Sequence, residues 1–385
     1  MLTLTAIYSF KIYLSINLLP PGWDEIANGN IFLTSDYLDV LLTSGPKNMQ
    51  CYFIGLFENE ALVGVALSQF LDSNQLESFG ERDRCMKKTI RNFIFRNFSS
   101  HVLFIGNNML TGQNAFVFAG HVNTTEALAT LLLAASEIES LLKKQGKKIH
   151  LITFKDFDAT VMARFPEENF KEYYRFSTQP NMVFTINEQW KSEQDYITAL
   201  SKKYRNQYTR ARKKMEGIVK RKMHLEDILA QEKEIYALYS HVARNAPFNT
   251  FFLSENHFSI FKEKLGDKFL FYGYFLDEKI IGFNTLIKNG NAMETYFLGY
   301  DEMIQKEKML YLNMLYDMVA YSINKGFKEI IFARTALEIK SAVGAEPVEV
   351  FGYIRHTNTM INKKMPAIFD FLEPKTVWQE RNPFK

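Results

Sequence analysis

The densest charge in the sequence is a basic segment near the middle of the chain. Residues 202–222 contain ten Lys or Arg and one acid, whereas the whole chain has a net charge of only +3. Apolar residues recur here every three or four positions, which predicts a helix with one core-facing stripe. Arg205 and Arg212 are seven residues apart, so they share a face at the edge of that stripe and could hold a phosphate or carboxylate together. We expect this pair to bind an anionic substrate, with a solvated helix face as the alternative.

Acid–base chemistry could come from a strand predicted over 293–300. A period of two places Glu294, Tyr296 and Tyr300 on one face, which would line a cleft. A carboxylate among aromatic rings has a raised pKa and can accept a proton from an attacking amine, so we predict Glu294 as the general base. Tyr296 is the second catalytic candidate, Tyr300 a substrate contact, and Asp301 the reserve base. A solvent-facing carboxylate and core tyrosines are the alternatives.

A third catalytic candidate is Lys340, which lies in the segment 335–347. Thr335 and Glu338 have the spacing of a capping box, so we interpret Glu338 as a helix cap. Lys340 then lies one turn into a helix that Gly344 ends. An ammonium there could stabilise the negative charge that develops on a tetrahedral acyl carbon. A surface lysine is the alternative.

Further substrate contacts are predicted beside two other strands. Arg334 follows a short apolar strand in the second half of the chain. In the first half, the stretch GNNMLTGQNAF at 106–116 offers Gly106, Asn107 and Gly112, and glycine lets backbone N–H groups approach an anion closely.

Several other reaction classes lack their sequence signatures. There is no GxSxG elbow, Walker loop, GxGxxG after a strand, HExxH or paired-histidine spacing, and Cys51 and Cys85 form no CxxC motif. We therefore expect no metal site and no permanently bound cofactor. The first 19 residues are largely apolar, but Lys11 interrupts them and no cationic region precedes them, so we predict a cytoplasmic protein.

The elements that must position these residues occur twice. Residues 51–70 and 270–290 both read as β-hairpins, with polar turn residues between β-rich arms. The two align at a constant shift of 218, which pairs Gly55 with Gly273, Phe57 with Phe275, Glu60 with Glu278, and Gly64 with Gly282. This similarity indicates an internal duplication.

Each hairpin is followed by a strand, a long helix that ends at Gly146 or Gly326, and another short apolar strand. We therefore predict two α/β (α+β) domains, each a mixed and mostly antiparallel sheet flanked by helices. A polar stretch suggests that they span 1–187 and 188–385. The first half has 82 positions from Gly64 to Gly146, against 44 from Gly282 to Gly326 in the second, and we assign the difference to a basic helical insertion near 72–100.

The order of these elements, with SKKYRNQYTRARKKMEG at 201–217 and ALEIKSAVGAEP at 336–347, resembles the Fem-type aminoacyltransferases and their acetyltransferase-like bacterial relatives. The resemblance implies two tandem GNAT-like domains and an acyltransferase whose active site belongs to the second. In the family's basic helix an arginine holds substrate phosphate, a role that would fall to Arg205. The family's segment after the last core strand has a lysine near the reacting carbonyl, a role that would fall to Lys340.

This resemblance implies N-acyl or aminoacyl transfer from an activated donor to the amine of an anionic acceptor. Acyl-CoA or another acyl thioester, acyl carrier protein and charged tRNA are the expected donors, although the stretch after Tyr300, DEMIQKEKMLYL, lacks the glycines of a CoA-binding loop. The acceptor would be a small molecule or lipid precursor, which leaves a peripheral membrane contact open.

Two other functions remain open. The 34 Phe and 19 Tyr would also suit a lipid-pathway N-acyltransferase that uses an acyl thioester. A non-catalytic nucleic-acid-binding protein is the alternative from another class, whereas the leading interpretation expects no stable nucleic-acid complex.

Overall fold

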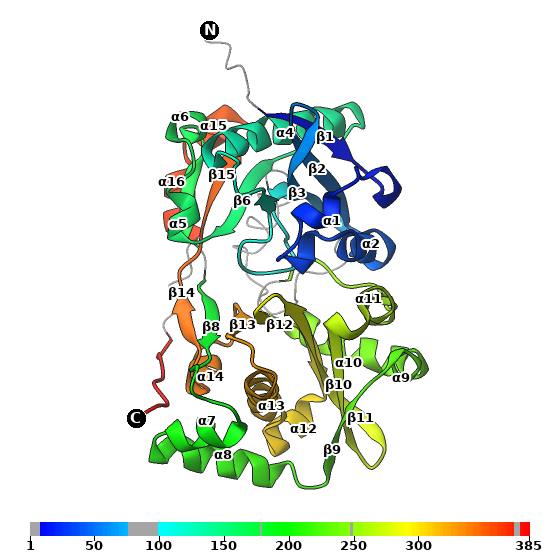
Figure 1. Ribbon diagram of the computed structural model, residues 1–385, viewed down its shortest axis with the longest axis vertical. Helices are drawn as coiled ribbons and strands as arrows, with labels where there is room; N and C mark the ends of the chain where they lie inside the picture. Colours follow the sequence, from blue (N-terminus) through cyan, green and yellow to red (C-terminus); the bar gives the residue numbers. More distant parts are fainter. Residues whose placement is uncertain (1–7, 76–98, 178, 247–248, 373–377) are drawn as a thin grey trace, which may run out of the picture. The chain divides into compact units, whose positions relative to one another are not determined.

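The computed structural model describes residues 8–75, 99–177, 179–246, 249–372 and 378–385 (Figure 1). The chain forms two compact units, one of residues 1–178 and 349–375 and the other of residues 179–348 and 376–385. Each unit has a mixed β-sheet and its own hydrophobic core. Among the described residues, no helix is long and apolar enough to cross a membrane.

The two sheets have the same strand order. In the first unit it is β1 (Ser9–Tyr13), β2 (Met49–Glu58), β3 (Ala61–Asp72), β4 (His101–Ile105), β6 (Leu151–Phe157), β15 (Phe351–His356) and β7 (Tyr174–Ser177), with β5 (Phe116–Phe118) also pairing with β3. In the second unit it is β9 (Ile218–Lys222), β10 (Phe269–Leu276), β11 (Lys279–Asn289), β12 (Ala292–Tyr300), β13 (Glu329–Ala333), β8 (Asn181–Thr185) and β14 (Glu346–Val348). In each sheet a single parallel pair, β4 with β6 or β12 with β13, lies among antiparallel neighbours.

The two hairpins are equivalent down to their irregularities. A β-bulge lies between Leu56 and Phe57 in the first hairpin and between Tyr274 and Phe275 in the second, again 218 positions apart. Both central residues of each tight turn have positive φ: Asn59, Glu60, Asp277 and Glu278. Two consecutive residues with positive φ match the strand twist of a hairpin. The predicted duplication and fold class are therefore confirmed.

The helices of the first unit are η1 (Ile16–Leu18), α1 (Trp23–Ile26), η2 (Ile31–Leu33), α2 (Ser35–Ser44), η3 (Ser73–Gln75), α4 (Thr124–Lys144), α5 (Ala159–Met162), α6 (Glu167–Phe170), α15 (Thr359–Asn362) and α16 (Met365–Leu372). Those of the second unit are α7 (Glu193–Ala199), α8 (Lys202–Lys214), α9 (Leu225–Ala230), α10 (Glu232–Asn245), α11 (His257–Leu265), η4 (Gly266–Lys268), α12 (Glu302–Lys308), α13 (Leu310–Asn324) and α14 (Leu337–Ala342). As predicted, α4 and α13 end at Gly146 and Gly326, both with positive φ.

The predicted ranges 1–187 and 188–385 differ from the two compact units because the halves exchange a strand. β8 follows β7 of the first sheet in the chain, yet it pairs with β13 and β14 of the second. β15 follows β14 of the second sheet and pairs with β6 and β7 of the first. Strand pairing is set by partners far apart in sequence, which a polar stretch cannot reveal. The predicted insertion at 72–100 falls largely on residues 76–98, outside the described part.

The second sheet is covered on both faces by helices. Leu270 and Tyr274 belong to the core that α7, α8 and α13 share. Phe269 and Phe271, the intervening residues of β10, contact Phe261 and Phe258 of α11. Because successive residues of a strand point to opposite faces, α13 and α11 cover opposite sides of the sheet.

Gly352 provides a test of the strand exchange. A Cβ atom there would lie 2.5 Å from the carbonyl oxygen of Phe154 and 2.8 Å from the Phe176 ring. Gly352→Ala should therefore destabilise the protein by about 1–3 kcal/mol through overpacking. Although the substitution lies late in the chain, we expect hydrogen exchange to show lost protection in β6 and β7 and none in β8 or β13. Gly120→Ala is the control, since nothing lies within 4 Å of its added Cβ. Lost protection confined to β13 would contradict the exchange.

Candidate functional site

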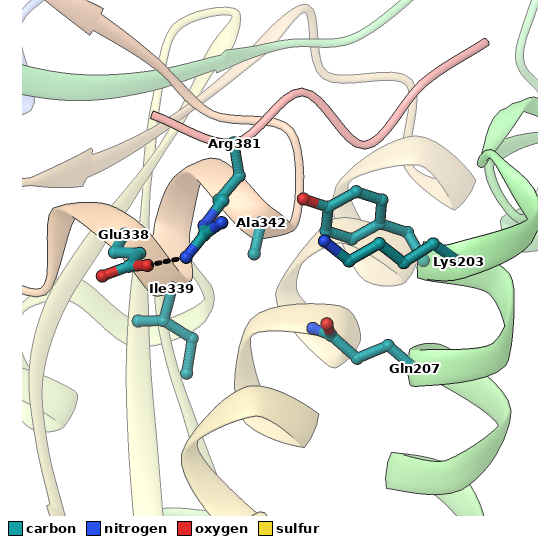
Figure 2. Close-up of a pocket in the computed structure, with 7 residues that line it drawn as sticks. Lys203, Gln207, Glu338, Ile339, Ala342 and Arg381 are labelled. Atoms are coloured by element: carbon teal, nitrogen blue, oxygen red, sulfur yellow. Dashed lines mark hydrogen bonds and ion pairs between the residues drawn. The ribbon is translucent and has the colours of Figure 1, made fainter. Parts of the chain in front are cut away.

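The two sequence motifs, more than a hundred residues apart, line one pocket in the second unit. This pocket of about 420 Å³ lies between α8, α14 and the segment 378–385, and we call it the α8–α14 pocket (Figure 2). Its lining residues are Lys203, Tyr204 and Gln207 from α8, Glu338, Ile339 and Ala342 from α14, and Arg381. Neither Arg205 nor Lys340, the residues predicted from these motifs, is among them.

The segment 378–385 fixes the position of both helices. The backbone N–H of Ser201, directly before α8, donates to the Pro383 carbonyl at 2.8 Å. The N–H of Arg381 donates to Ser341 Oγ of α14 at 3.0 Å. Phe384 packs against the rings of Phe184, Trp190 and Tyr196, which supplies apolar burial to hold the segment.

The pocket carries two cations and one acid. Glu338 forms an ion pair and hydrogen bond with Arg381, and Figure 2 shows both side chains on the pocket wall. Lys203 lies on the wall formed by α8, its ammonium 5.2 Å from the centre of the Tyr204 ring. The pocket therefore has a net positive charge, which suits an anionic ligand. Sequence reasoning missed Arg381 because no local pattern links it to either motif.

A second pocket, of about 350 Å³, adjoins the start of α14. It is lined by Gln179, Thr335, Ala336, Leu337, Glu338, Ile339 and Trp378. Three residues of the turn before α14 have positive φ without being glycine: Ala333, Thr335 and Ala336. Such backbone is costly and persists only where the surroundings hold it, so the turn is a strained feature at the edge of this second pocket.

The predicted capping box at the start of α14 is wrong. The N-cap residue is Ala336, with φ 46°, and no side chain caps the helix. Glu338 turns to Arg381 instead. The left-handed turn moves the helix start one residue beyond the one that the capping-box spacing indicates.

Lys340 holds this strained turn. Its side chain is buried, 5% exposed, and Nζ donates to the carbonyl oxygens of Ala333 at 3.2 Å and Arg334 at 2.5 Å. Burial lowers the pKa of Lys340 to about 7 and that of the half-buried Arg334 to about 10. The structure thus gives Lys340 a structural role, hydrogen bonding to the turn at 333–336, that the sequence did not suggest.

Arg205 and Arg212 do not act as a pair. All three guanidinium nitrogens of Arg212 make hydrogen bonds: Nη1 to Asp317 at 2.7 Å, Nη2 to Glu193 at 2.8 Å and Nε to Tyr208 at 3.1 Å. Burial lowers the pKa of Arg212, but Asp317, Tyr208 and Glu193 together outweigh that effect, and the net pKa is raised. Arg212 therefore binds α8 to α7 and α13, and its guanidinium is already engaged by Asp317, Glu193 and Tyr208.

A β-bulge separates the residues expected on one face of β12. Thr295 pairs with Leu286 and Leu298 pairs with Asn284, so two residues of β12 oppose one of β11. Such an extra residue reverses the alternation of side chains. Tyr296 faces α11, where its hydroxyl lies 3.0 Å from His257 Nε2, whereas Tyr300 packs with Tyr311 on the α13 side. The prediction of a shared face therefore fails for Tyr300, which lies on the opposite side of the sheet from Tyr296.

Glu294 lies on the α11 side with Tyr296, because neighbouring Met293 belongs to the core on the α13 side. It is 9% exposed and accepts a hydrogen bond from Asn289 Nδ2 at 3.2 Å. Burial raises its pKa to about 7, the range suited to a general base. The α8–α14 pocket borders helices on the other side of the sheet, so the structure does not bring Glu294 to this pocket.

Asp301, the reserve base, caps α12. Its Oδ1 accepts hydrogen bonds from the N–H groups of Met303 and Ile304 at 3.0 and 3.2 Å. These are the donors that a pyrophosphate would need at this helix, and the carboxylate would also repel it. In this structure the Asp301 carboxylate therefore occupies the N–H groups of Met303 and Ile304.

The glycine-rich stretch belongs to the first unit. Gly106 and Gly112 both have positive φ, and the buried Asn107 donates through Nδ2 to the Tyr37 hydroxyl at 2.8 Å. Lys155 Nζ donates to the carbonyls of Asn107 and Leu110, both at 3.0 Å. The loop is thus tied down by its own unit. The described residues contain no cluster of three or more metal-ligating side chains.

The pKa values of Glu294 and Lys340 predict two stability changes of opposite sign. The folded state holds the Glu294 proton more tightly than the unfolded state does. The free energy of unfolding should therefore fall as pH rises between about pH 4.5 and 7, by on the order of 3 kcal/mol. The folded state holds the Lys340 proton less tightly, so between about pH 7 and 10.5 stability should rise with pH. Denaturant unfolding of wild type and Glu294→Gln across pH checks this. A fall in the lower window that survives in Glu294→Gln would contradict the assignment.

Comparison with solved structures shows what the fold is similar to. FemX superposes with a TM-score of 0.53 at 11% identity, over 95% of this chain and 100% of that one. A conserved protein of unknown function from Bacteroides thetaiotaomicron superposes with a TM-score of 0.49 at 11% identity, over 90% and 99% of the two chains. A tandem GNAT protein from the clavulanic acid biosynthesis pathway gives 0.49 at 10% identity, over 91% and 99%.

No protein-family model matches the sequence, and no curated protein matches it. The likeness to FemX concerns the fold, and it extends over nearly the whole of both chains. Together with the duplicated strand order, it shows that this chain has a duplicated fold like that of FemX.

Proposed function

We propose that this protein transfers an acyl or aminoacyl group from an activated donor to the amine of an anionic acceptor, which it binds in the α8–α14 pocket. The observation that carries the proposal is the meeting of the two motifs, which were recognised separately in the sequence, on the walls of one pocket. The net positive charge of that pocket supports an anionic acceptor.

The reaction joins the acceptor nitrogen to the donor's carbonyl carbon. The nitrogen attacks that carbon, the bond from the carbonyl carbon to the sulfur or oxygen of the donor breaks, and the proton lost by the amine goes to the leaving group. Acyl-CoA, another acyl thioester, acyl carrier protein and charged tRNA are the donors to compare. The Asp301 cap argues against a CoA pyrophosphate bound at α12.

The roles of the side chains follow from their positions. We propose that Lys203 attracts the anionic group of the acceptor, since it lines the pocket, and that Arg205 adds to the positive field of the same helix. Lys340 acts as a positioning residue through the turn at 333–336. We further propose that the protein works in the cytoplasm, on a small molecule or lipid precursor.

The first test compares the replacement of one lysine with the replacement of one arginine in α8. Lys203→Met should raise the KM of an anionic acceptor by roughly 10-fold, the loss of one charged hydrogen bond, and leave kcat nearly unchanged. Arg205→Met is the matched control, because it removes the same charge from α8 outside the pocket lining. The donor for this assay is identified first, by measuring the thermal shift that each of the four donors produces and then the transfer that each supports. A larger loss in Arg205→Met than in Lys203→Met would place the acceptor elsewhere.

The second test concerns Lys340. Lys340→Met leaves the carbonyls of Ala333 and Arg334 without their donor, so it should lower the free energy of unfolding by about 1–3 kcal/mol. If the ammonium also stabilises an oxyanion, kcat should fall by about 10²–10³ at a temperature where the variant remains fully folded. Ser136→Ala in α4, which removes an exposed helix hydroxyl, is a control that should change neither. Full kcat in folded Lys340→Met would exclude a role in the chemical step.

A further inference from the structure

An internal carboxylate occupies the strongest anion-binding group of the α8–α14 pocket. Glu338 is bound to the Arg381 guanidinium, and the side chains are 51% and 29% exposed. An ion pair this open to water contributes little to stability, so it exchanges readily with a competing ion. Arg381 can therefore accept a carboxylate from a ligand in place of Glu338.

Arg381 does not depend on Glu338 for its position. Its backbone N–H is bound to Ser341 Oγ, and Pro383 and Phe384 hold the same segment through the Ser201 N–H and an aromatic cluster. Releasing Glu338 would therefore leave the backbone of Arg381 in place, with its guanidinium free to bind another carboxylate in the pocket.

A second cation faces the same space. Lys203 comes from the opposite wall, and no ion pair of Lys203 is found in the described part of the chain. Gln207 adds an amide to the same wall. A carboxylate that entered between Arg381 and Lys203 would meet two positive charges, whereas the Glu338 carboxylate, within the described part of the chain, is ion-paired with Arg381 alone.

We propose that the α8–α14 pocket is a carboxylate receptor in which Glu338 is an internal competitor, and that the acceptor is a small amino carboxylate. The ligand carboxylate displaces Glu338 and lies between Arg381 and Lys203, and the released Glu338 faces the ligand's ammonium. The planar guanidinium matches a carboxylate, which is the group that it holds already. The identification of the ligand as acceptor rests on the proposed function, but its binding does not.

The test measures binding without any acyl donor, at constant ionic strength. The probes are β-alanine, which has an amine and a carboxylate, ethanolamine, which lacks the carboxylate, and phosphoethanolamine, which replaces it with phosphate. Tryptophan fluorescence can report binding, because Trp378 lies three residues before Arg381 and Trp190 contacts Phe384. We expect saturable β-alanine binding and at least 10-fold weaker binding of ethanolamine.

Two substitutions should act in opposite directions. Arg381→Met should weaken β-alanine binding by at least 10-fold, with Arg381→Lys retaining part of it. Glu338→Gln removes the competing charge and should tighten the binding of free carboxylate, by about 2- to 5-fold for propionate, which has no ammonium to lose a contact with Glu338. Circular dichroism of each variant verifies that the second unit remains folded.

The matched controls come from another exposed ion pair in the same unit. Arg221 donates to both carboxylate oxygens of Glu278, away from the pocket lining. Arg221→Met and Glu278→Gln repeat the two charge changes there and should leave the dissociation constants of β-alanine and propionate unchanged.

The proposed carboxylate receptor would be overturned if Glu338→Gln weakened propionate binding, or if Arg381→Met left β-alanine binding unchanged. Tighter binding of phosphoethanolamine than of β-alanine, with the same response to Arg381→Met, would overturn the assignment to a carboxylate. If the binding pattern holds but no donor yields transfer to β-alanine, the proposed acyl transfer fails and the receptor stands. If transfer occurs without any of these binding effects, the receptor fails alone.

Discussion

The binding of Arg212 to Asp317 is the interaction on which the site depends. Arg212 lies in the last turn of α8 and Asp317 in α13, and a second carboxylate, Glu193 of α7, binds the same guanidinium. Tyr274 of the sheet donates to the other oxygen of Asp317 at 2.8 Å. This network joins three helices to a strand. A half-buried ion pair of this kind is costly to break, since removing one partner leaves a poorly solvated charge.

The network fixes one end of α8 and the segment 378–385 fixes the other. Ser201 is bound to Pro383 at the start of the helix, while Arg212 is held to α13 near its end. The helix is thereby set at a constant distance from α14, and the residues between the two attachments form a wall of the pocket. The basic composition of α8 thus has two physical uses, because Arg212 is structural while Lys203 remains available to a ligand.

Much of the fold could be predicted because its signals are local. The hairpin turns and the helix-ending glycines depend on residues adjacent in sequence. The duplication could be recognised because each hairpin carries the same local pattern, 218 positions apart. The strand exchange could not be predicted, since β8 and β15 each find partners more than a hundred residues away. The site follows the same rule: both motifs were recognised, but the bulge that turns Tyr300 away from Glu294, and the return of Arg381, are set by tertiary pairing.

The two halves have diverged at one equivalent place. Ser68 pairs with Ile105 in the first sheet, and Leu286, 218 positions later, pairs with Thr295 in the second. Beyond these two pairs the strands of the two units differ. Ten residues, 106–115, separate Ile105 from the strand that resumes at β5, whereas the second unit has the two-residue bulge.

Each unit holds an irregular segment at this end of its parallel strand pair with a buried lysine. Lys155 donates to two carbonyls of the 106–115 loop, and Lys340 donates to two carbonyls of the turn at 333–336. A buried ammonium requires such acceptors, because desolvation without them would be prohibitive. In the first unit the lysine anchors a long loop, and in the second it anchors a short turn that lines the second pocket. The two lysines come from different elements, β6 and α14, so the two units support these backbone segments with residues that are not equivalent in the duplication.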